Sequence, residues 1–288
     1  MAFTIPHRLV ENCRKTPELA AWLAQLPGAI HDLEERWRLT IGSPFDGEDV
    51  SCAWVATATL PDATSAVLKL SMPHMEGEDE IAGLRFWNGD PTVRVLEADD
   101  RLGAMLLERC EPGLSLRSLP EPEQDPIIAQ LLNRLWRFPE SGHRFRPLSA
   151  LTAYWSEETL ASADQWTDPG LVREGLELFK ELPDTSRGEM LLATDLHAGN
   201  ALQARREPWL VIDPKPFVGD PAFDATQHLF NCKVRLRSNP DETIRRFAEL
   251  LGVDERRVRL WIFARAAAEP RDNWRDARLT DLAQTLAP

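Results

Sequence analysis

The chain has 288 residues, of which 43% are hydrophobic and 27% are charged, as expected for a globular protein with a sizeable core. Lysine and arginine total 33 and aspartate and glutamate total 46, so the formal net charge is −13. This charge argues against sequence-independent binding to nucleic acid or anionic lipid, and it would attract a cationic small molecule, although an acidic balance also serves solubility.

The four cysteines are far apart in the sequence and include no C-x-x-C pair. Their spacing fits neither a zinc site nor a disulfide framework, and it suits a reducing cytoplasm. The first fifteen residues lack the apolar core of a signal peptide, and no apolar run approaches the ~18 residues that cross a bilayer. We therefore expect a cytoplasmic protein without a membrane partner, either a monomer or a homodimer.

The first part of the chain combines helices with strands. Helical spacing predicts two leading helices at 16–26 and 29–39, and a third helix at 76–90 that ends at Asn88-Gly89. Four β-rich runs are predicted as two pairs of strands, at 50–60, 64–72, 92–99 and 103–110. This pattern predicts a small lobe that is rich in β-structure.

The second part of the chain is mainly helical. It follows a segment rich in proline and glutamate, and its amphipathic runs are predicted as helices at 127–138, 151–166, 170–182, 222–236, 241–252 and 254–269. We predict an α+β protein with an N-terminal lobe at 1–108, a hinge and linker at 109–125, and a helical C-terminal lobe at 126–288.

One polar stretch interrupts these helices, "LLATDLHAGNALQARREPWLVIDPKP" at 191–216. Each of its polar residues alone is an ordinary turn former. However, Asp195 precedes Asn200 by five positions, as in the catalytic loop of kinases. A strand, a turn and a second strand would return Asp213 to the side of Asn200. Two oxygen ligands would then suit Mg²⁺ with bound phosphates, while Asp195 could accept the proton of an attacking hydroxyl.

The first lobe offers the other parts of a phosphoryl-transfer site. Lys69 lies in "AVLKLS", an otherwise apolar strand that is similar to the kinase V-A-I-K strand, and a lysine there needs a partner. Glu80 follows eleven positions later in the predicted helix and could supply that partner. Taken singly, Glu80 could also be a solvated helix residue like its acidic neighbours.

In this order, Lys69, Glu80, "MLLERCEPG", "DLHAGN" and "IDPKPFVGDPAFD" resemble the aminoglycoside phosphotransferase family, a branch of the protein-kinase-like fold. Longer phrases such as "VIDPKPFVGDPAFDATQHL" most resemble its streptomycin 6-kinase and hydroxyurea phosphotransferase group. The resemblance runs from about Val50 to Asn231. It implies a bilobal kinase-like fold and a Mg²⁺-dependent transfer of the γ-phosphate of ATP or GTP to a hydroxyl of a small molecule, such as streptomycin or hydroxyurea.

The same resemblance implies roles for individual residues. Asp195 would be the catalytic base, Asn200 and Asp213 would bind Mg²⁺, and Lys69 with Glu80 would position the nucleotide. Glu108, Arg109 and Cys110 would form the hinge that meets the nucleotide base. His197 would lie beside the transferred phosphate or support the loop, and Lys215 would add charge near the phosphates.

Two departures from the family pattern lie in the polar stretch. Ala193-Thr194 precede Asp195 where the family usually has His-Gly, and Pro216 stands where close relatives often have Gly. Neither change removes a catalytic group. In "GDPAFD" we expect structural roles, with Asp220 bonding loop amides and Asp224 capping the next helix.

The acceptor site is expected beside the helices of the C-terminal lobe. There Trp155 could form an aromatic wall, and Glu157 and Glu158 could pair with a cationic acceptor. The alternative, which the amphipathic pattern favours, is that the two glutamates are the solvated face of the helix.

Two other functions are compatible with the residues. A degenerate kinase fold could act as a binding or regulatory protein, an alternative that Ala193-Thr194 raises. A metal-dependent hydrolase could use Asp195, His197 and Asp213, but no second histidine lies at ligand spacing from His197.

Overall fold

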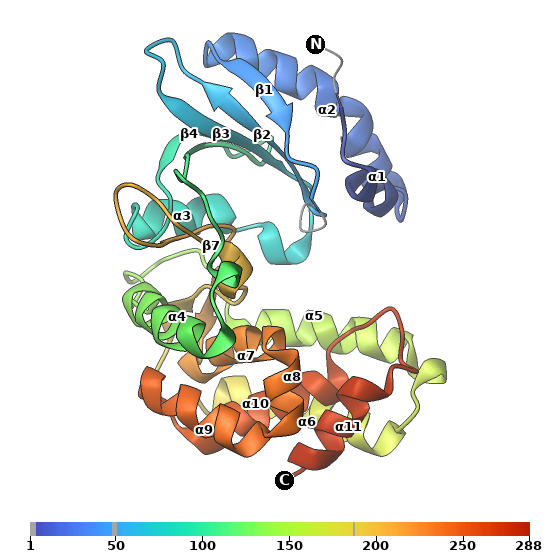
Figure 1. Cartoon of the computed structure of the whole chain (residues 1–288). Helices are drawn as coiled ribbons and strands as arrows, with labels where there is room; N and C mark the ends of the chain where they lie inside the picture. The colour runs from blue at the N-terminus through green and yellow to red at the C-terminus, as the bar shows by residue number, and fades with distance from the viewer. Residues whose placement is uncertain (1–3, 48–50, 187) are drawn as a thin grey trace. The chain divides into compact units, whose positions relative to one another are not determined.

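The computed structural model describes residues 4–47, 51–186 and 188–288 (Figure 1). The chain folds into two compact units. The first comprises Met1–Leu114 with Leu202–Ile212, and the second comprises Ser115–Ala201 with Asp213–Pro288. The first combines a sheet with helices and the second is mainly helical, so the predicted α+β class is confirmed.

The first unit is built on a five-stranded antiparallel sheet of order β1-β2-β3-β5-β4. Its strands are β1 (Thr40–Pro44), β2 (Ala53–Thr59), β3 (Ser65–Ser71), β4 (Val95–Asp99) and β5 (Ala104–Glu108). Its helices are α1 (His7–Cys13), α2 (Pro17–Arg36), the short 3₁₀ turn η1 (Met75–Gly77) and α3 (Glu80–Trp87). Val50, the first residue of a predicted strand, lies outside the described residues.

The two faces of this sheet pack against different helices (Figure 1). Because successive side chains of a strand point to opposite faces, Leu68 and Leu70 of β3 join the core formed with α1 and α2. Val67 packs in the other core, where α3 contributes Ile81 and Leu84. Lys69 follows the alternation of Val67, and it therefore lies on the face that α3 covers.

The two predicted leading helices are one continuous helix, α2, with Pro27 inside it. Pro27 and Gly28 are exposed, whereas Leu26, Ile30 and Leu33 form one buried stripe at helical spacing. Burial of this stripe against the sheet outweighs the local helix-breaking tendency. The sequence analysis also did not predict α1 and β1.

The second unit consists mainly of helices. They are η2 (Leu116–Ser118), α4 (Glu121–Leu135), α5 (Leu148–Ala161), η3 (Ala163–Gln165), α6 (Pro169–Asp184), η4 (Ala198–Asn200), α7 (Pro221–Asn231), α8 (Lys233–Ser238), α9 (Pro240–Leu251), α10 (Glu255–Ala268) and α11 (Ala277–Leu286). β6 (Met190–Leu192) pairs antiparallel with β9 (Phe217–Gly219). The predicted helix at 222–236 is interrupted at Cys232, and α11 was not predicted.

The predicted polar hairpin contains two short paired strands, β7 (Ala201–Leu202) and β8 (Leu210–Val211). Its tip belongs to the first unit, because the Gln203 amide donates to the Leu114 carbonyl and the Val211 amide donates to the Pro91 carbonyl. The sequence pattern predicted the whole hairpin in the C-terminal lobe.

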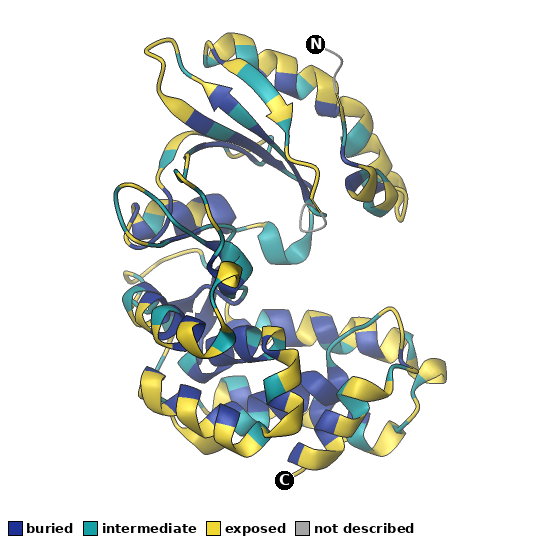
Figure 2. Ribbon diagram, viewed as in Figure 1, coloured by how far each residue is buried: buried dark blue, intermediate teal, exposed yellow. Residues whose placement is uncertain are grey.

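Within the second unit, α10 is buried along most of its length. Figure 2 shows it largely buried, whereas α9 is buried along one side only. Gly175 of α6 lies against α10, and a Cβ atom at Gly175 would come within 2.8 Å of the Ala268 Cβ and 2.9 Å of the Ala267 Cβ. The missing side chain therefore sets how closely these two helices pack. None of the helices among the described residues has both the length and the apolarity that a bilayer crossing requires.

We predict opposite effects for two glycine-to-alanine substitutions. Gly175→Ala should lower the free energy of unfolding by about 1–3 kcal/mol, because the added methyl group must push α6 and α10 apart. Gly28→Ala in α2 is the control, since nothing lies within 4 Å of its Cβ position. It should raise stability by up to about 1 kcal/mol through helix propensity. Urea unfolding followed by tryptophan fluorescence measures both, and a Gly175→Ala protein as stable as the parent would contradict the packing argument.

Candidate active site

Lys69 and Glu80 form a buried ion pair in the first unit. The Lys69 Nζ lies 2.6 Å from Glu80 Oε1, and the two side chains are 9% and 3% exposed. The Ser71 hydroxyl donates to the other carboxylate oxygen at 3.3 Å. The lysine in the apolar strand thus has the partner that the sequence predicted. A buried ammonium held at a fixed place is suited to binding a phosphate.

Glu108, in the predicted hinge, bonds to a residue that the sequence analysis missed. Arg206 donates to its two carboxylate oxygens at 3.0 and 2.9 Å and also reaches the carbonyls of Gly89 and Thr92. Burial opposes ionisation of Glu108, but the hydrogen bonds from Arg206 and from the Arg94 amide, together with the charges of both arginines, keep the pKa of the carboxyl below its ordinary value. Arg206 therefore fixes the end of β5.

The other two hinge residues differ in exposure. Arg109 is exposed, whereas Cys110 is partly buried, and burial raises the pKa of its thiol to about 11. Contact of this segment with a nucleotide base stays a prediction.

In the second unit, the loop before Asp195 is fixed by a buried carboxylate. The amides of Ala193 and Thr194 donate to Asp224 Oδ2 and Oδ1 at 3.0 and 2.6 Å, and the Trp136 indole donates to Oδ2 at 2.9 Å. Burial raises the pKa of Asp224 to about 6, against these hydrogen bonds that favour the charged form.

The expected roles of the two GDPAFD aspartates are reversed in the structure. Asp220 directly precedes Pro221, the first residue of α7, and it caps that helix by accepting from the Ala222 amide. Asp224, which is one turn further along α7 and points inward, is the residue that accepts the loop amides. The proline at the first helical position was the signal that identified Asp220 as the cap.

Thr194 has a left-handed backbone with φ of 49°, where the family usually has glycine. Its hydroxyl donates to the Lys215 carbonyl at 2.6 Å, and the Lys215 amide donates to the Ala193 carbonyl at 2.8 Å. The threonine hydroxyl thus adds a side-chain bond to the backbone contact between this loop and the segment carrying Lys215.

Both carboxylate oxygens of Asp195 accept hydrogen bonds. Lys215 Nζ donates to Oδ2 at 2.6 Å, and Gln227 Nε2 donates to Oδ1 at 2.6 Å. The carboxylate has an exposed fraction of 19%, so it is accessible to a small molecule. Lys215 was predicted beside the phosphates and is found beside the predicted base.

Asn200 and Asp213 offer a donor set suited to a hard cation. The Asn200 amide nitrogen donates to the Asp195 backbone carbonyl at 2.9 Å, which turns its side-chain oxygen away as a potential ligand. Asn200 directly precedes β7 and Asp213 closely follows β8, so chain continuity places both at one end of this short ladder. A carboxamide oxygen and a carboxylate fit Mg²⁺.

The His197 side chain stabilises the backbone of the loop that follows Asp195. Its Nδ1 accepts from the Gly199 amide at 2.9 Å. Gly199 is closely surrounded, since a Cβ atom there would lie 2.6 Å from both His197 Cε1 and Arg117 Cζ. The contact of His197 with a phosphate stays a prediction.

Of the predicted acceptor residues on α5, Trp155 is in the core and the two glutamates are exposed. The Trp155 ring packs against Phe179 and Phe223 at centroid distances of 5.8 and 5.9 Å and is 7% exposed. The expectation of an aromatic wall at Trp155 was therefore wrong, because helical spacing turns this position inward. Glu157 and Glu158 lie on the opposite, solvated side of the helix.

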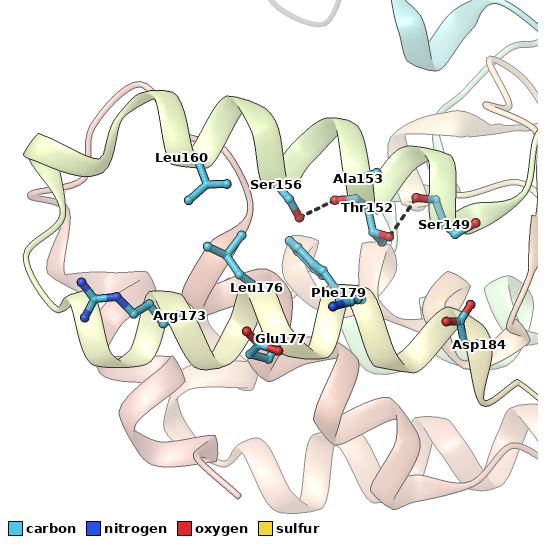
Figure 3. Close-up of a pocket in the computed structure, with 11 residues that line it drawn as sticks. Ser149, Thr152, Ala153, Ser156, Leu160, Arg173, Leu176, Glu177, Phe179 and Asp184 are labelled. Atoms are coloured by element: carbon cyan, nitrogen blue, oxygen red, sulfur yellow. Dashed lines mark hydrogen bonds between the residues drawn. The ribbon is translucent and has the colours of Figure 1, made fainter.

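A cavity of about 620 Å³ lies along α5 and α6 (Figure 3). Apolar side chains such as Leu176 and Phe179 lie beside charged ones such as Arg173 and Glu177. None of the predicted site residues lines it, so it does not support a role in the predicted chemistry.

The structure gives no support to the hydrolase hypothesis. Among the described residues, one group of acid, histidine and cysteine side chains is close enough to hold a metal, and it consists of Asp125, His228 and Cys232. It includes no residue of the catalytic loop. The Arg235 guanidinium already donates to both Asp125 oxygens at 2.6 and 2.7 Å and to the Cys232 sulfur at 3.2 Å. This cluster is therefore a buried ion-pair network.

Comparison with known proteins agrees with this geometry. Residues 36–275 match the model of a family described as aminoglycoside/hydroxyurea antibiotic resistance kinase. The chain belongs to this family. It is therefore a phosphotransferase of the small-molecule kinase type, with a hydroxyl as acceptor.

Curated relatives of this kinase are similar over most of their length. Streptomycin 6-kinase from Streptomyces glaucescens is 36% identical over 256 residues, which cover 85% of this chain and 82% of the relative. Hydroxyurea phosphotransferase from Kitasatospora aureofaciens is 36% identical over 251 residues, covering 83% and 71%.

Solved structures support the kinase fold. The choline kinase LicA from Streptococcus pneumoniae superposes with a TM-score of 0.63 at 12% identity, covering 91% of this chain and 99% of that one. The aminoglycoside phosphotransferase APH(3'')-Id from Streptomyces rimosus gives a TM-score of 0.54 at 16% identity, covering 92% and 98%. The predicted protein-kinase-like fold is thus confirmed.

The buried Asp224 predicts a specific pH dependence of stability. Its pKa of about 6 in the folded protein lies above the ordinary 3.8, so the folded state takes up a proton that the unfolded state does not as the pH falls through 6. The contribution of Asp224 to stability therefore grows at acidic pH and is lost as the pH rises through 6. Relative to Asp224→Asn, the free energy of unfolding should rise by about 1 kcal/mol between pH 7 and pH 5. Urea titrations of both proteins at the two pH values measure this, and a pH-independent difference would argue against the raised pKa.

Proposed function

We propose that this kinase transfers the γ-phosphate of ATP or GTP to a hydroxyl of a small polar molecule, with streptomycin-type aminoglycosides and hydroxyurea as the leading acceptors. The observation that carries the proposal is the partly exposed Asp195 carboxylate, held by Lys215 and Gln227 in a loop that Asp224 anchors. The names of the relatives, which act on streptomycin and hydroxyurea, supply the acceptor candidates.

In the proposed reaction Asp195 orients the acceptor hydroxyl and accepts its proton. The hydroxyl oxygen forms a bond to the γ-phosphorus as the bond from that phosphorus to the bridging oxygen breaks. The electron pair of the broken bond stays on the nucleoside diphosphate. A carboxylate fixed in place before the substrate arrives lowers the barrier through positioning.

The nucleotide would be held by residues of the first unit. Lys69, fixed by Glu80, would bind its phosphates, and the backbone of Glu108, Arg109 and Cys110 would meet the base. Asn200 and Asp213 of the second unit would hold Mg²⁺, which neutralises charge on the phosphates when bound. His197 would support the loop beside the transferred phosphate.

A cationic acceptor would suit the charge of this chain. The formal net charge is −13, and Glu157 and Glu158 present exposed carboxylates on α5. Their attraction for an amine would act mainly on encounter and orientation, since exposed ion pairs contribute little affinity. A cytoplasmic location fits the nucleotide donor and four cysteines that are all unpaired.

The first test is a phosphate-transfer screen detected by mass, with ATP or GTP, Mg²⁺, and streptomycin and hydroxyurea among the acceptors. Asp195→Asn should lower kcat by about 10²–10⁴-fold with nucleotide affinity retained, because it removes the base without changing its size. Asp281→Asn, an exposed aspartate of α11, is the control. Retained turnover in Asp195→Asn would reject this base. Nucleotide binding without transfer to any acceptor would instead favour a degenerate kinase that acts as a binding protein.

A second test addresses the nucleotide. Lys69→Met should weaken the binding of Mg²⁺-nucleotide by about 10-fold or more, since it removes a phosphate ligand and leaves Glu80 buried without its lysine. Lys15→Met, an exposed lysine in the same unit, should bind as the parent does. Isothermal titration measures both affinities. Equal binding by Lys69→Met would exclude Lys69 from the nucleotide site.

A further inference from the structure

Gln227 is a polar residue on a helix that otherwise faces the interior. Around it in α7, Ala225, Thr226, His228 and Leu229 are all buried. Its Nε2 donates to Asp195 Oδ1 at 2.6 Å. A side-chain amide in such a position needs partners for both of its ends, and the carboxylate is the partner of the nitrogen.

Arg265 of α10 fixes which end of the amide faces Asp195. Its Nη2 donates to Gln227 Oε1 at 2.9 Å. A guanidinium can only donate and a carboxylate can only accept, so the amide oxygen must face Arg265 and the nitrogen must face Asp195. Both neighbours require the same orientation.

Arg265 is itself held on several sides. Its side chain is 5% exposed, and it forms an ion pair with Glu269 at 2.7 Å. Its guanidinium carbon lies 5.3, 5.2 and 4.9 Å from the ring centroids of Trp155, Phe223 and Phe230. Gln227 therefore rests on a rigid part of the core.

Lys215 is the second side chain that donates to the Asp195 carboxylate. It reaches Asp195 Oδ2 through a single ammonium on a flexible stem and is 15% exposed. A lysine side chain is able to rotate between a carboxylate and a phosphate, whereas Gln227 cannot leave Asp195 Oδ1 without also leaving Arg265.

We propose that Gln227 is a positioning residue that fixes the orientation of the catalytic carboxylate and thereby selects which oxygen acts as the base. Gln227 keeps Oδ1. Lys215 moves from Oδ2 to the γ-phosphate when the nucleotide is bound, and Oδ2 then accepts the proton of the acceptor hydroxyl. The oxygen–phosphorus bonds form and break as in the proposed function, on which this assignment rests.

The test compares Gln227→Met with the parent enzyme under saturating nucleotide. Methionine has a similar length and cannot donate a hydrogen bond. We expect kcat to fall by about 10- to 100-fold with the KM values and the nucleotide affinity nearly unchanged, because only the orientation of the base is lost. Gln227→Glu should lose more, since it opposes a second carboxylate to Asp195. Gln284→Met is the matched control, because it removes an exposed hydrogen bond from the Gln284 side-chain amide to Asp168.

A kcat of Gln227→Met close to that of the parent would overturn the assignment, and so would a loss confined to KM. If the methionine variant does not fold, Gln227→Asn, whose amide is too short to reach both partners, replaces it with the same expectation. Absence of transfer by the parent itself would count against the proposed function instead. Crystal structures test the positioning claim independently of activity. The Asp195 carboxylate should rotate in Gln227→Met, and an unchanged orientation would overturn the claim.

Discussion

The buried carboxylate of Asp224 is the point to which the catalytic loop is fixed. It lies on α7 and accepts from two successive backbone amides, those of Ala193 and Thr194, and from the Trp136 indole. An amide buried without an acceptor would be strongly unfavourable, so these bonds hold the loop against one helix. The same helix carries Gln227, which holds the side chain of Asp195. The loop before Asp195 and the side chain of Asp195, the proposed base, are thus both held by residues of one helix.

The sequence was sufficient to predict the parts whose signals are local or ordered along the chain. The isolated lysine in an apolar strand predicted the Lys69–Glu80 pair, which the structure contains, while the catalytic role inferred from the spacing of Asp195 and Asn200 stays a prediction. Two leading helices were predicted where one exists, because packing against the sheet overrides Pro27. Tertiary context of this kind has no signature in a short window of sequence.

The residues that the sequence analysis missed act through long-range contacts. Arg206 stands in a hairpin and meets Glu108 about a hundred positions earlier, while Arg265 meets Gln227 from another helix. Composition and spacing indicate neither pair. Trp155 was predicted as an aromatic wall of the acceptor site. Its ring instead lies in the core, where it stacks with the Arg265 guanidinium that orients Gln227. Trp155 therefore belongs to the core that surrounds Arg265.

At Thr194, the departure from the family pattern changes the conformational entropy that the chain loses on folding. A glycine at this left-handed position would adopt it without strain, but it would leave the unfolded chain with more conformations and would lack the hydroxyl bond to Lys215. The threonine accepts strain of about 1–2 kcal/mol and offsets it through the hydroxyl bond to Lys215. The threonine thus limits the conformations open to the unfolded chain, and in the folded chain it ties the loop before Asp195 to the segment that carries Lys215.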